Sequence, residues 1–256
     1  MGLPYSGVKL FLELWRRGFL KNFESVVDMG SQELQMPIED FENLIKTYKN
    51  SKYQEENFSN LKNWPGIPKC STKPFYEMLG IEKYSSIDLN KHHGAIPYDL
   101  NLPLEDKSMY GQYDLVTDFG NNEHVFNIAE AYRTMHRLCK RQGIMVILQA
   151  AFHGNGYYNF DLSFFEGMAA ANRYNILFSS YIIPVDNKMQ YHIPLSNRLL
   201  GFIDTAKAFE IIICYVFQKT SDSDFRLPYQ SDYLSSNQGL LGFEIQFHFD
   251  PPRRTY

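Results

Sequence analysis

The stretch Tyr113-Asp114-Leu115-Val116-Thr117-Asp118 is the plainest strand signal in the sequence, and the elements around it decide the fold. Its middle is apolar and partly β-branched and its end is an acid, which is typical of a buried strand that leads into a turn. Residues 123–140 then place apolar side chains at intervals of three and four, which predicts a helix with one buried face. Residues 144–150 form a continuous apolar run, as expected of a parallel strand covered on both faces.

The same alternation of strand and helix extends toward both ends of the chain. The sequence predicts further strands at 25–28, 84–89, 95–100, 176–183 and 209–218, and a helix at about 162–172. We therefore predict an α/β fold of the Rossmann-like type, an open and mostly parallel sheet with helices on both faces.

No linker or repeat divides the 256 residues, so we expect a single domain. Residues 1–24 predict an amphipathic helix that packs on the sheet, with a membrane-surface role as the weaker alternative. Residues 31–83 are far more than one crossover helix needs, and we expect an insertion or lid there. Residues 220–256 predict an irregular C-terminal extension with one further strand at 241–249.

Charge and cysteine content narrow the class of protein. The formal net charge is −4 and basic residues are scattered, so nucleic acid is not an expected partner. The N-terminus lacks the uninterrupted apolar core of a signal peptide or a spanning helix, so no membrane partner is expected either. Cys70, Cys139 and Cys214 lie far apart without CxxC spacing, which suits reduced thiols and predicts a cytoplasmic protein.

Polar residues follow each of the first four predicted strands. In an open parallel sheet the ligand lies outside the carboxyl ends of the strands, so these residues are the candidates for binding. A glycine turn, two acids and a polar loop, in that order, are typical of a site for a nucleoside-bearing ligand, although one glycine turn alone is often structural. The candidates are Asp28, Gly30, Ser31 and Gln32, then Asp88 and Leu89, then Asp99 and Leu100, then Asp118 and Phe119.

Over roughly residues 25–218 the chain resembles the class I S-adenosylmethionine-dependent methyltransferase family. Asp28-Met29-Gly30-Ser31 looks like the first motif of that family, Asp88 like its ribose-binding acid, and Asp99-Leu100 like its adenine-contacting pair. Residues 113–125 followed by 139–143 resemble its passage of strand, helix and Lys-Pro-Gly-Gly, with Arg141-Gln142 in place of Pro-Gly.

The resemblance implies S-adenosyl-L-methionine as the cofactor and methyl transfer to an O or N of a small-molecule acceptor. Residues 153–172 resemble a subgroup with small-molecule or sugar-type acceptors. Ser31 and Gln32 stand where the first motif usually has further glycines. A dinucleotide enzyme is disfavoured because Gly30 does not begin the G-x-G-x-x-G spacing that a pyrophosphate requires. A non-catalytic binding or partner protein on the same fold stays the alternative.

A base is needed only if the acceptor holds a proton. His124 and His153 are the candidates because both follow predicted strand ends and histidine titrates near neutral pH. Glu123 is a third candidate, which could orient the acceptor. His92-His93 has no further ligands at metal spacing, so the sequence predicts no metal.

Overall fold

The helices and strands alternate as the sequence predicts. A computed structural model describes residues 2–37, 40–41, 43–44, 71–184, 190–196 and 210–229 of the chain. The strands are β1 (Gly2–Leu3), β2 (Ser25–Met29), β3 (Glu33–Leu34), β4 (Lys83–Ile87), β5 (Tyr113–Phe119), β6 (Cys139–Phe152), β7 (Asn175–Pro184), β8 (Gln190–Ile193) and β9 (Ile211–Gln218). The α-helices are α1 (Tyr5–Arg16), α3 (Lys73–Met78), α4 (Ile128–Leu138) and α5 (Leu162–Asn172), and short 3₁₀ turns cover His92–Gly94, Lys107–Met109 and Asn122–His124.

Seven strands form one sheet in the order β4-β2-β5-β6-β9-β7-β8. The first four are parallel to one another. Strand β9 is antiparallel to both of its neighbours, so β7 runs in the same direction as β6, and β8 is antiparallel to β7. The predicted Rossmann-like, open and mostly parallel sheet is therefore confirmed.

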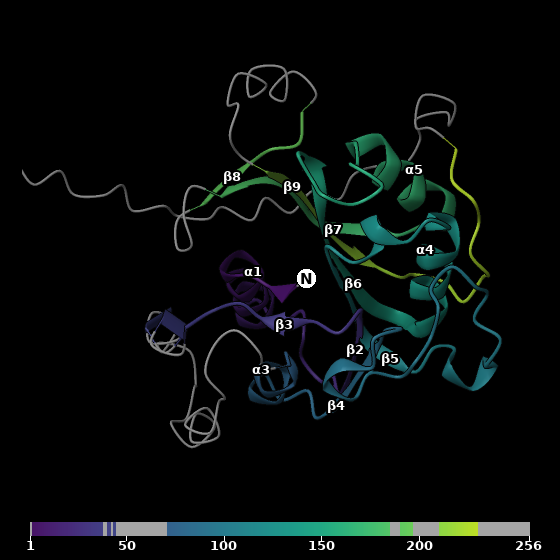
Figure 1. The fold of residues 1–256 in the computed structure, drawn as a ribbon, viewed down its shortest axis with the longest axis horizontal. Coiled ribbons are helices and arrows are strands. Elements are labelled where there is room, and N and C mark those ends of the chain that lie inside the picture. Colours follow the sequence, from purple (N-terminus) through teal and green to yellow (C-terminus); the bar gives the residue numbers. More distant parts are fainter. Residues whose placement is uncertain are drawn as a thin grey trace, which may run out of the picture.

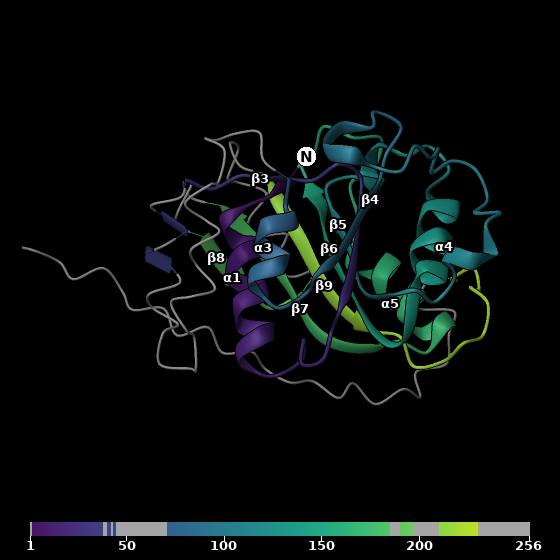
Figure 2. The ribbon, with the colours of Figure 1, turned by 90° about the horizontal axis from the view of Figure 1, so that it is seen from below.

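Helices cover both faces of this sheet, with α1 and α3 on one side and α4 and α5 on the other (Figures 1 and 2). Successive residues of a strand point to opposite faces, and the two cores follow that rule. Val26 packs in the core beneath α1 and α3, and its neighbour Val27 packs in the core beneath α4 and α5. The continuous apolar runs of the sequence thus reflect burial on both faces.

The N-terminal segment packs on the sheet, as predicted. The ring of Phe11 in α1 makes edge-on contacts with the rings of Phe75 and Tyr76 in α3 and Phe119 at the end of β5. Strand β1 pairs in parallel with β3, which holds the first residues of the chain beside the segment that leaves β2. In the part of the chain that the structure describes, no helix is long and apolar enough to cross a membrane.

One predicted strand is wrong. Residues 95–100 form only an isolated bridge, in which Ile96 pairs with Ile87 of β4. Pro97 has no N–H to continue the ladder, and Asp99 accepts the N–H of Asn101 in a turn. The predicted strands at 25–28, 84–89, 113–118, 144–150, 176–183 and 209–218 are confirmed with shifted ends, and the helix at 162–172 is confirmed.

The helix expected at 123–140 is shorter and begins at Ile128, and β8 was not predicted. Residues 45–70 of the predicted insertion and the strand at 241–249 lie outside the described residues, so the lid and the further strand stay predictions.

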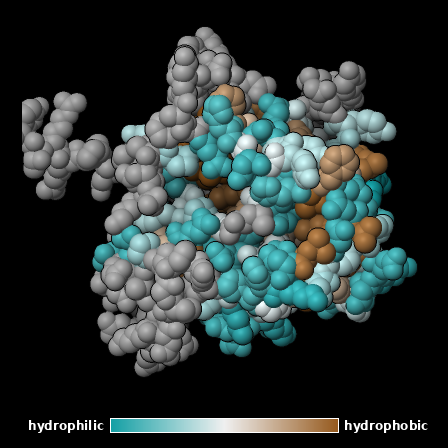
Figure 3. Space-filling view, viewed as in Figure 1, coloured by the Kyte–Doolittle hydropathy of each residue, from teal (hydrophilic) through white to brown (hydrophobic). Residues whose placement is uncertain are grey.

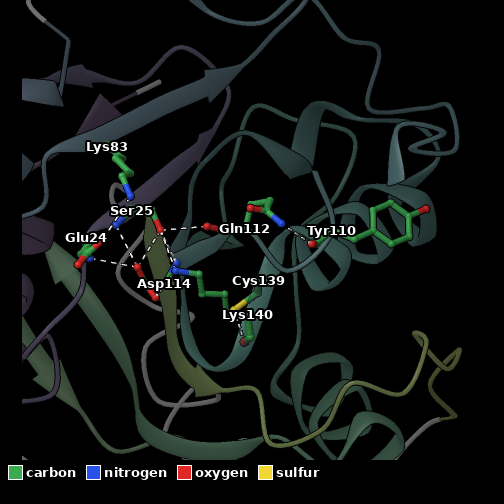
Figure 4. A network of polar contacts seen from close by, with 8 residues as sticks. All are labelled: Glu24, Ser25, Lys83, Tyr110, Gln112, Asp114, Cys139 and Lys140. Carbon is green, nitrogen blue, oxygen red and sulfur yellow. Dashed lines mark hydrogen bonds and ion pairs between the residues drawn. The ribbon is translucent and has the colours of Figure 1, made fainter. Parts of the chain in front are cut away.

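The amino-terminal edge of the sheet is closed by a polar network (Figure 4). The Asp114 carboxylate accepts hydrogen bonds from the Ser25 hydroxyl at 2.7 Å and from Lys140 Nζ at 2.8 Å. Burial raises the pKa of Asp114, but the hydrogen bonds from Lys140 and Ser25 outweigh it and hold the pKa below its ordinary value. This network joins β2, β5 and β6, and leaves the opposite, carboxyl-terminal edge as the place for a site.

Candidate active site

The glycine turn after β2 is confirmed as a place where only glycine fits. Gly30 has a φ of +87°, and its N–H donates to Ile87 O at 2.8 Å. A Cβ at Gly30 would overlap the side-chain oxygen Oδ1 of Asn121, which follows β5. Gln32, two residues on, is buried and donates to Met29 O. The space directly over Gly30 is thus filled by a side chain of the protein itself.

The acid after β4 lies against this turn. Asp88 Oδ2 accepts the backbone N–H of Ser31 at 2.7 Å and the side-chain amide of Asn90 at 3.0 Å, and Oδ1 accepts the backbone N–H of Asn90 at 3.1 Å. Asp88 is half-buried. The structure therefore brings together Gly30, Ser31 and Asp88, as the pairing of β2 with β4 requires.

Asp28 lies behind the turn. Its carboxylate is fully buried and accepts hydrogen bonds from the hydroxyls of Thr72, Tyr76, Tyr84 and Thr117. Burial raises the pKa of Asp28 to about 6, against the lowering effect of those four donors. Both oxygens are engaged within the fold, so the predicted direct contact of Asp28 with a cofactor is not what the geometry offers. Asp28 holds β2 to α3, β4 and β5 instead.

Asp99 and Leu100, the pair predicted to contact adenine, are not placed together on the surface. Hydrogen bonds from Asn101 lower the pKa of Asp99, and Asn101 in turn accepts the N–H of Asn127 at the start of α4. Leu100 is buried in the core under α4, whereas Leu89 is exposed. Asp99 and Leu89 stay on the surface near the carboxyl edge, and Leu100 does not.

Asp118, at the end of β5, is fully buried. Its Oδ1 accepts the backbone N–H groups of Asn121 and Asn122 at 3.3 and 3.1 Å, and its Oδ2 accepts Gln149 Nε2 at 2.5 Å. Burial raises the pKa of Asp118 to about 7. Like Asp28, Asp118 fixes a loop and does not face a ligand, whereas its neighbour Phe119 borders the cavity described next.

A cavity of about 1020 Å³ opens at the carboxyl edge, over the ends of β5 and β6. The space-filling view of this side shows hydrophobic atoms recessed between hydrophilic ones near its middle (Figure 3). The described residues that line the cavity are Gly2, Pro4, Tyr5, Ser6, Gln35, Met36, Pro37, Asp40, Phe119, Gly120, Glu123, His124, Leu148, Gln149, Ala150, Asn155, Pro184, Gln190, Glu210 and Ile212.

Two of the three predicted catalytic residues lie in this cavity wall. Glu123 Oε2 accepts the backbone N–H of Ala150 at 2.9 Å, and its Oε1 is 3.5 Å from His124 Nε2. The backbone carbonyl of Glu123 accepts the N–H groups of Tyr157 and Tyr158, so the loop after β6 holds Glu123 from the other side. The Glu123 side chain is 5% exposed and that of His124 is 38% exposed, so the pair joins a fixed carboxylate to an accessible imidazole.

The third predicted catalytic residue is not brought to the cavity. His153 is exposed, has a left-handed backbone with a φ of +57°, and places its ring against Phe152. It is absent from the described lining residues. The loop after β6 therefore turns His153 away from Glu123 and His124.

Gln149 and Glu210 are two of the cavity residues to which the sequence did not point. Gln149 is the polar residue inside the apolar run 144–150, and it is 1% exposed. A polar side chain in a strand buried on both faces is a signal that could have been used. Glu210 stands just before β9, where nothing in its neighbours distinguishes it; burial, and then the charge of Glu123, raise its pKa.

Comparisons with known proteins give the setting for this geometry. No family model and no curated protein match the sequence. The chain is similar in structure to a 1,6-didemethyltoxoflavin N1-methyltransferase of Burkholderia thailandensis, solved with S-adenosylhomocysteine (10% identity, TM-score 0.38, 84% of this chain and 78% of that one). It is also similar to an S-adenosylmethionine-dependent methyltransferase of Archaeoglobus fulgidus (12%, 0.43, 83% and 94%) and to the YcgJ protein of Bacillus subtilis (13%, 0.39, 83% and 99%). At these identities and TM-scores, the assignment of a function rests on the residues of this chain.

Proposed function

We propose that this protein is an S-adenosylmethionine-dependent methyltransferase that acts on an O or N atom of a small molecule. The observation that carries the proposal is the hydrogen bond between the Asp88 carboxylate and the Ser31 N–H. It joins the glycine turn after β2 to the acid after β4, and the cavity begins on β5, the other neighbour of β2. A nucleoside site and an acceptor site are thus adjacent on one sheet edge, where the strand order reverses.

The residues at the turn can hold the ribose of the cofactor. Asp88 uses its two oxygens for three hydrogen bonds, and a carboxylate accepts about four. A half-buried acid with acceptor capacity left can therefore take a ribose hydroxyl. Because Asn121 covers Gly30, the ligand would pass beside that glycine and not across it.

When bound, S-adenosylmethionine supplies an electrophilic methyl group. The residues of the chain position the acceptor, and alignment of this kind supplies much of the rate in a displacement. Glu123 is fixed by Ala150 and can orient a donor group of the acceptor, while His124 beside it can take a proton where the acceptor holds one.

The test is calorimetric titration of the purified protein with S-adenosylhomocysteine. We expect micromolar binding, a strong loss in Asp88→Ala, and no change in Glu105→Ala, which removes an exposed acid elsewhere on the surface. Equal binding by wild type and Asp88→Ala would remove Asp88 from the site.

One observation favours a second candidate, a binding or partner protein on the same fold without catalysis. Asn121 occupies the space over the only glycine of the turn. If the wild-type protein gives no heat at high ligand concentration, this second function replaces the first.

A further inference from the structure

We propose that the cavity at the carboxyl edge binds a small molecule through a protonated amine, which lies between the carboxylates of Glu123 and Glu210. This inference rests on the proposed function for its meaning, since it names the acceptor class as an amine, whose nitrogen accepts a methyl group only after the ammonium has given a proton to a base such as His124. The binding itself can be tested independently.

Glu123 supplies the first carboxylate. Its side chain is 5% exposed, one oxygen is held by the Ala150 N–H, and the other lies 3.5 Å from His124 Nε2. No described lysine or arginine forms an ion pair with Glu123, and burying a carboxylate without a full counter-charge is costly. A cation that enters the cavity would lower that cost.

Glu210 supplies the second carboxylate. It immediately precedes Ile211, which is paired with Phe152 at the carboxyl end of β6. Glu210 therefore stands at the same edge as Glu123, and both line the cavity. Burial, and then the negative charge of Glu123, raise the pKa of Glu210, although its side chain keeps contact with solvent at this end of β9. An ammonium group between them would relieve the repulsion.

The rest of the described wall fits a cation and not an anion. Neither lysine nor arginine occurs among the described lining residues. Lys9, whose Nζ lies 5.7 Å from the ring of Tyr5, is not a lining residue. The cavity therefore disfavours phosphate and carboxylate ligands on charge alone.

Gln149 gives an independent indication that a hydrogen-bond donor is missing. The side chain lines the cavity and is 1% exposed, and its Nε2 donates to Asp118. Its Oε1 is buried and has no hydrogen-bond partner among the described residues. A buried amide oxygen without a donor is unusual, and the N–H of an amine would satisfy it if the side chain turns this oxygen, which water does not reach, toward the cavity.

A metal ion is a poorer occupant than an amine. Within the described ranges, no group of three His, Cys, Asp or Glu side chains converges to hold a metal. Two separated carboxylates and an amide oxygen instead suit a ligand that donates several hydrogen bonds from one charged nitrogen. The side chain of Phe119 in the same wall can pack against the carbon skeleton that bears it.

The experiment compares ligands that share a carbon skeleton and differ in charge, using saturation-transfer NMR followed by calorimetry at neutral pH. The first set is phenethylamine, phenethyl alcohol and phenylacetate, and the second is cyclohexylamine, cyclohexanol and cyclohexanecarboxylate. We expect the amines to bind and the alcohols and acids to bind about tenfold or more weakly, as loss of a charged hydrogen bond implies.

Substitutions of single glutamates test where the amine binds. Glu210→Gln and Glu123→Gln should each weaken amine binding about tenfold, whereas Glu105→Gln should leave it unchanged. Glu210 is at the surface end of β9, so its variant is expected to fold even if Glu123→Gln does not. Alcohols that bind as well as amines, no binding by either amine, or amine binding unaffected by Glu210→Gln would each overturn the inference.

Titration with S-adenosylhomocysteine, run on the same samples, separates this inference from the proposed function. Amine binding without S-adenosylhomocysteine binding would support the cation site and contradict the proposed methyltransferase function. The reverse result would keep the methyltransferase and exclude an amine acceptor at this site.

Discussion

At the scale of single residues, Gly30 and Asn121 show that a glycine predicted for a ligand is also required by the fold itself. A glycine turn after the first strand was predicted for a ligand, and the structure shows a second demand on it. The backbone is left-handed at a φ of +87°, and the Asn121 side chain occupies the place of a Cβ.

These two requirements at position 30 predict a loss of stability when the glycine is replaced. We expect Gly30→Ala to lower the free energy of unfolding by about 2 to 4 kcal/mol, from the left-handed backbone and the overlap with Asn121 together. Urea unfolding of Gly30→Ala, Asn121→Ala and the double variant separates the two terms. The double variant should lose less than the sum of the single losses, and strict additivity would show that Asn121 does not press on residue 30.

The catalytic candidates show what residue-level inference can and cannot reach. Glu123 and His124 could be predicted because they follow a strand whose end is unmistakable. His153 follows one too, but its left-handed backbone turns it elsewhere, and the sequence carries no sign of that. Glu210 comes to the site only because β9 pairs antiparallel to β6, a long-range contact that no local pattern encodes.

At the scale of elements, the aromatic contacts of Phe11 connect α1 to the site. Its ring touches Phe75 and Tyr76 of α3 and Phe119, which lines the cavity. The sequence predicted that the N-terminal helix packs on the sheet, because apolar residues recur along it. It could not predict that the helix supports a cavity wall, since Phe119 is more than a hundred residues away.

Truncating this ring should therefore affect stability and site together. We expect Phe11→Ala to lower the free energy of unfolding by about 3 to 5 kcal/mol, because Phe11 is fully buried. Phe11→Leu keeps most of the volume and should cost less than half as much. Thermal unfolding gives the first quantity, and amine titration of the folded Phe11→Leu protein reports on the cavity. A Phe11→Ala loss below about 1 kcal/mol would mean that α1 is not firmly docked.

The third predicted strand failed at this scale for a local reason. Residues 95–100 have strand-like composition, but Pro97 lacks the N–H that a ladder needs, so only Ile96 pairs with Ile87. The proline was visible in the sequence.

At the scale of the whole molecule, the acids at the two edges of the sheet differ in whether a basic side chain is paired with them. Asp114 at the amino edge is paired with Lys140, which keeps its pKa low. Asp28 and Asp118, on the neighbouring strands, are buried without a described basic partner. Burial raises their pKa values to about 6 and about 7. The strand pattern predicted that these acids end their strands, but whether a cation meets each one depends on packing.

The raised pKa values of Asp28 and Asp118 predict a contribution to stability that is largest below neutral pH. Asp28 and Asp118 bind protons more tightly in the folded protein than in the unfolded chain, where aspartate titrates near 3.8. Between about pH 4 and about pH 7 their contribution to the free energy of unfolding should therefore fall as the pH rises, whereas the contribution of His136 and His192, whose pKa values burial lowers from 6.5 to about 4, should rise over most of that range. Asp114 works in the opposite sense, because its lowered pKa means that its stabilisation is lost as the pH falls below about 4.

Urea unfolding of the wild type and of Asp118→Asn across this pH range isolates the contribution of Asp118. The variant keeps the shape of the side chain, and if the Gln149 amide turns, the unpartnered Oε1 can accept the new N–H. We expect its free energy of unfolding to exceed that of the wild type above about pH 7, by on the order of 2 kcal/mol, and the difference between the two proteins to grow as the pH rises from about 4 to about 7. Asp222→Asn, at an exposed position, should show neither effect. If that difference stays constant with pH, the proton that stabilises the folded protein at low pH does not reside on Asp118.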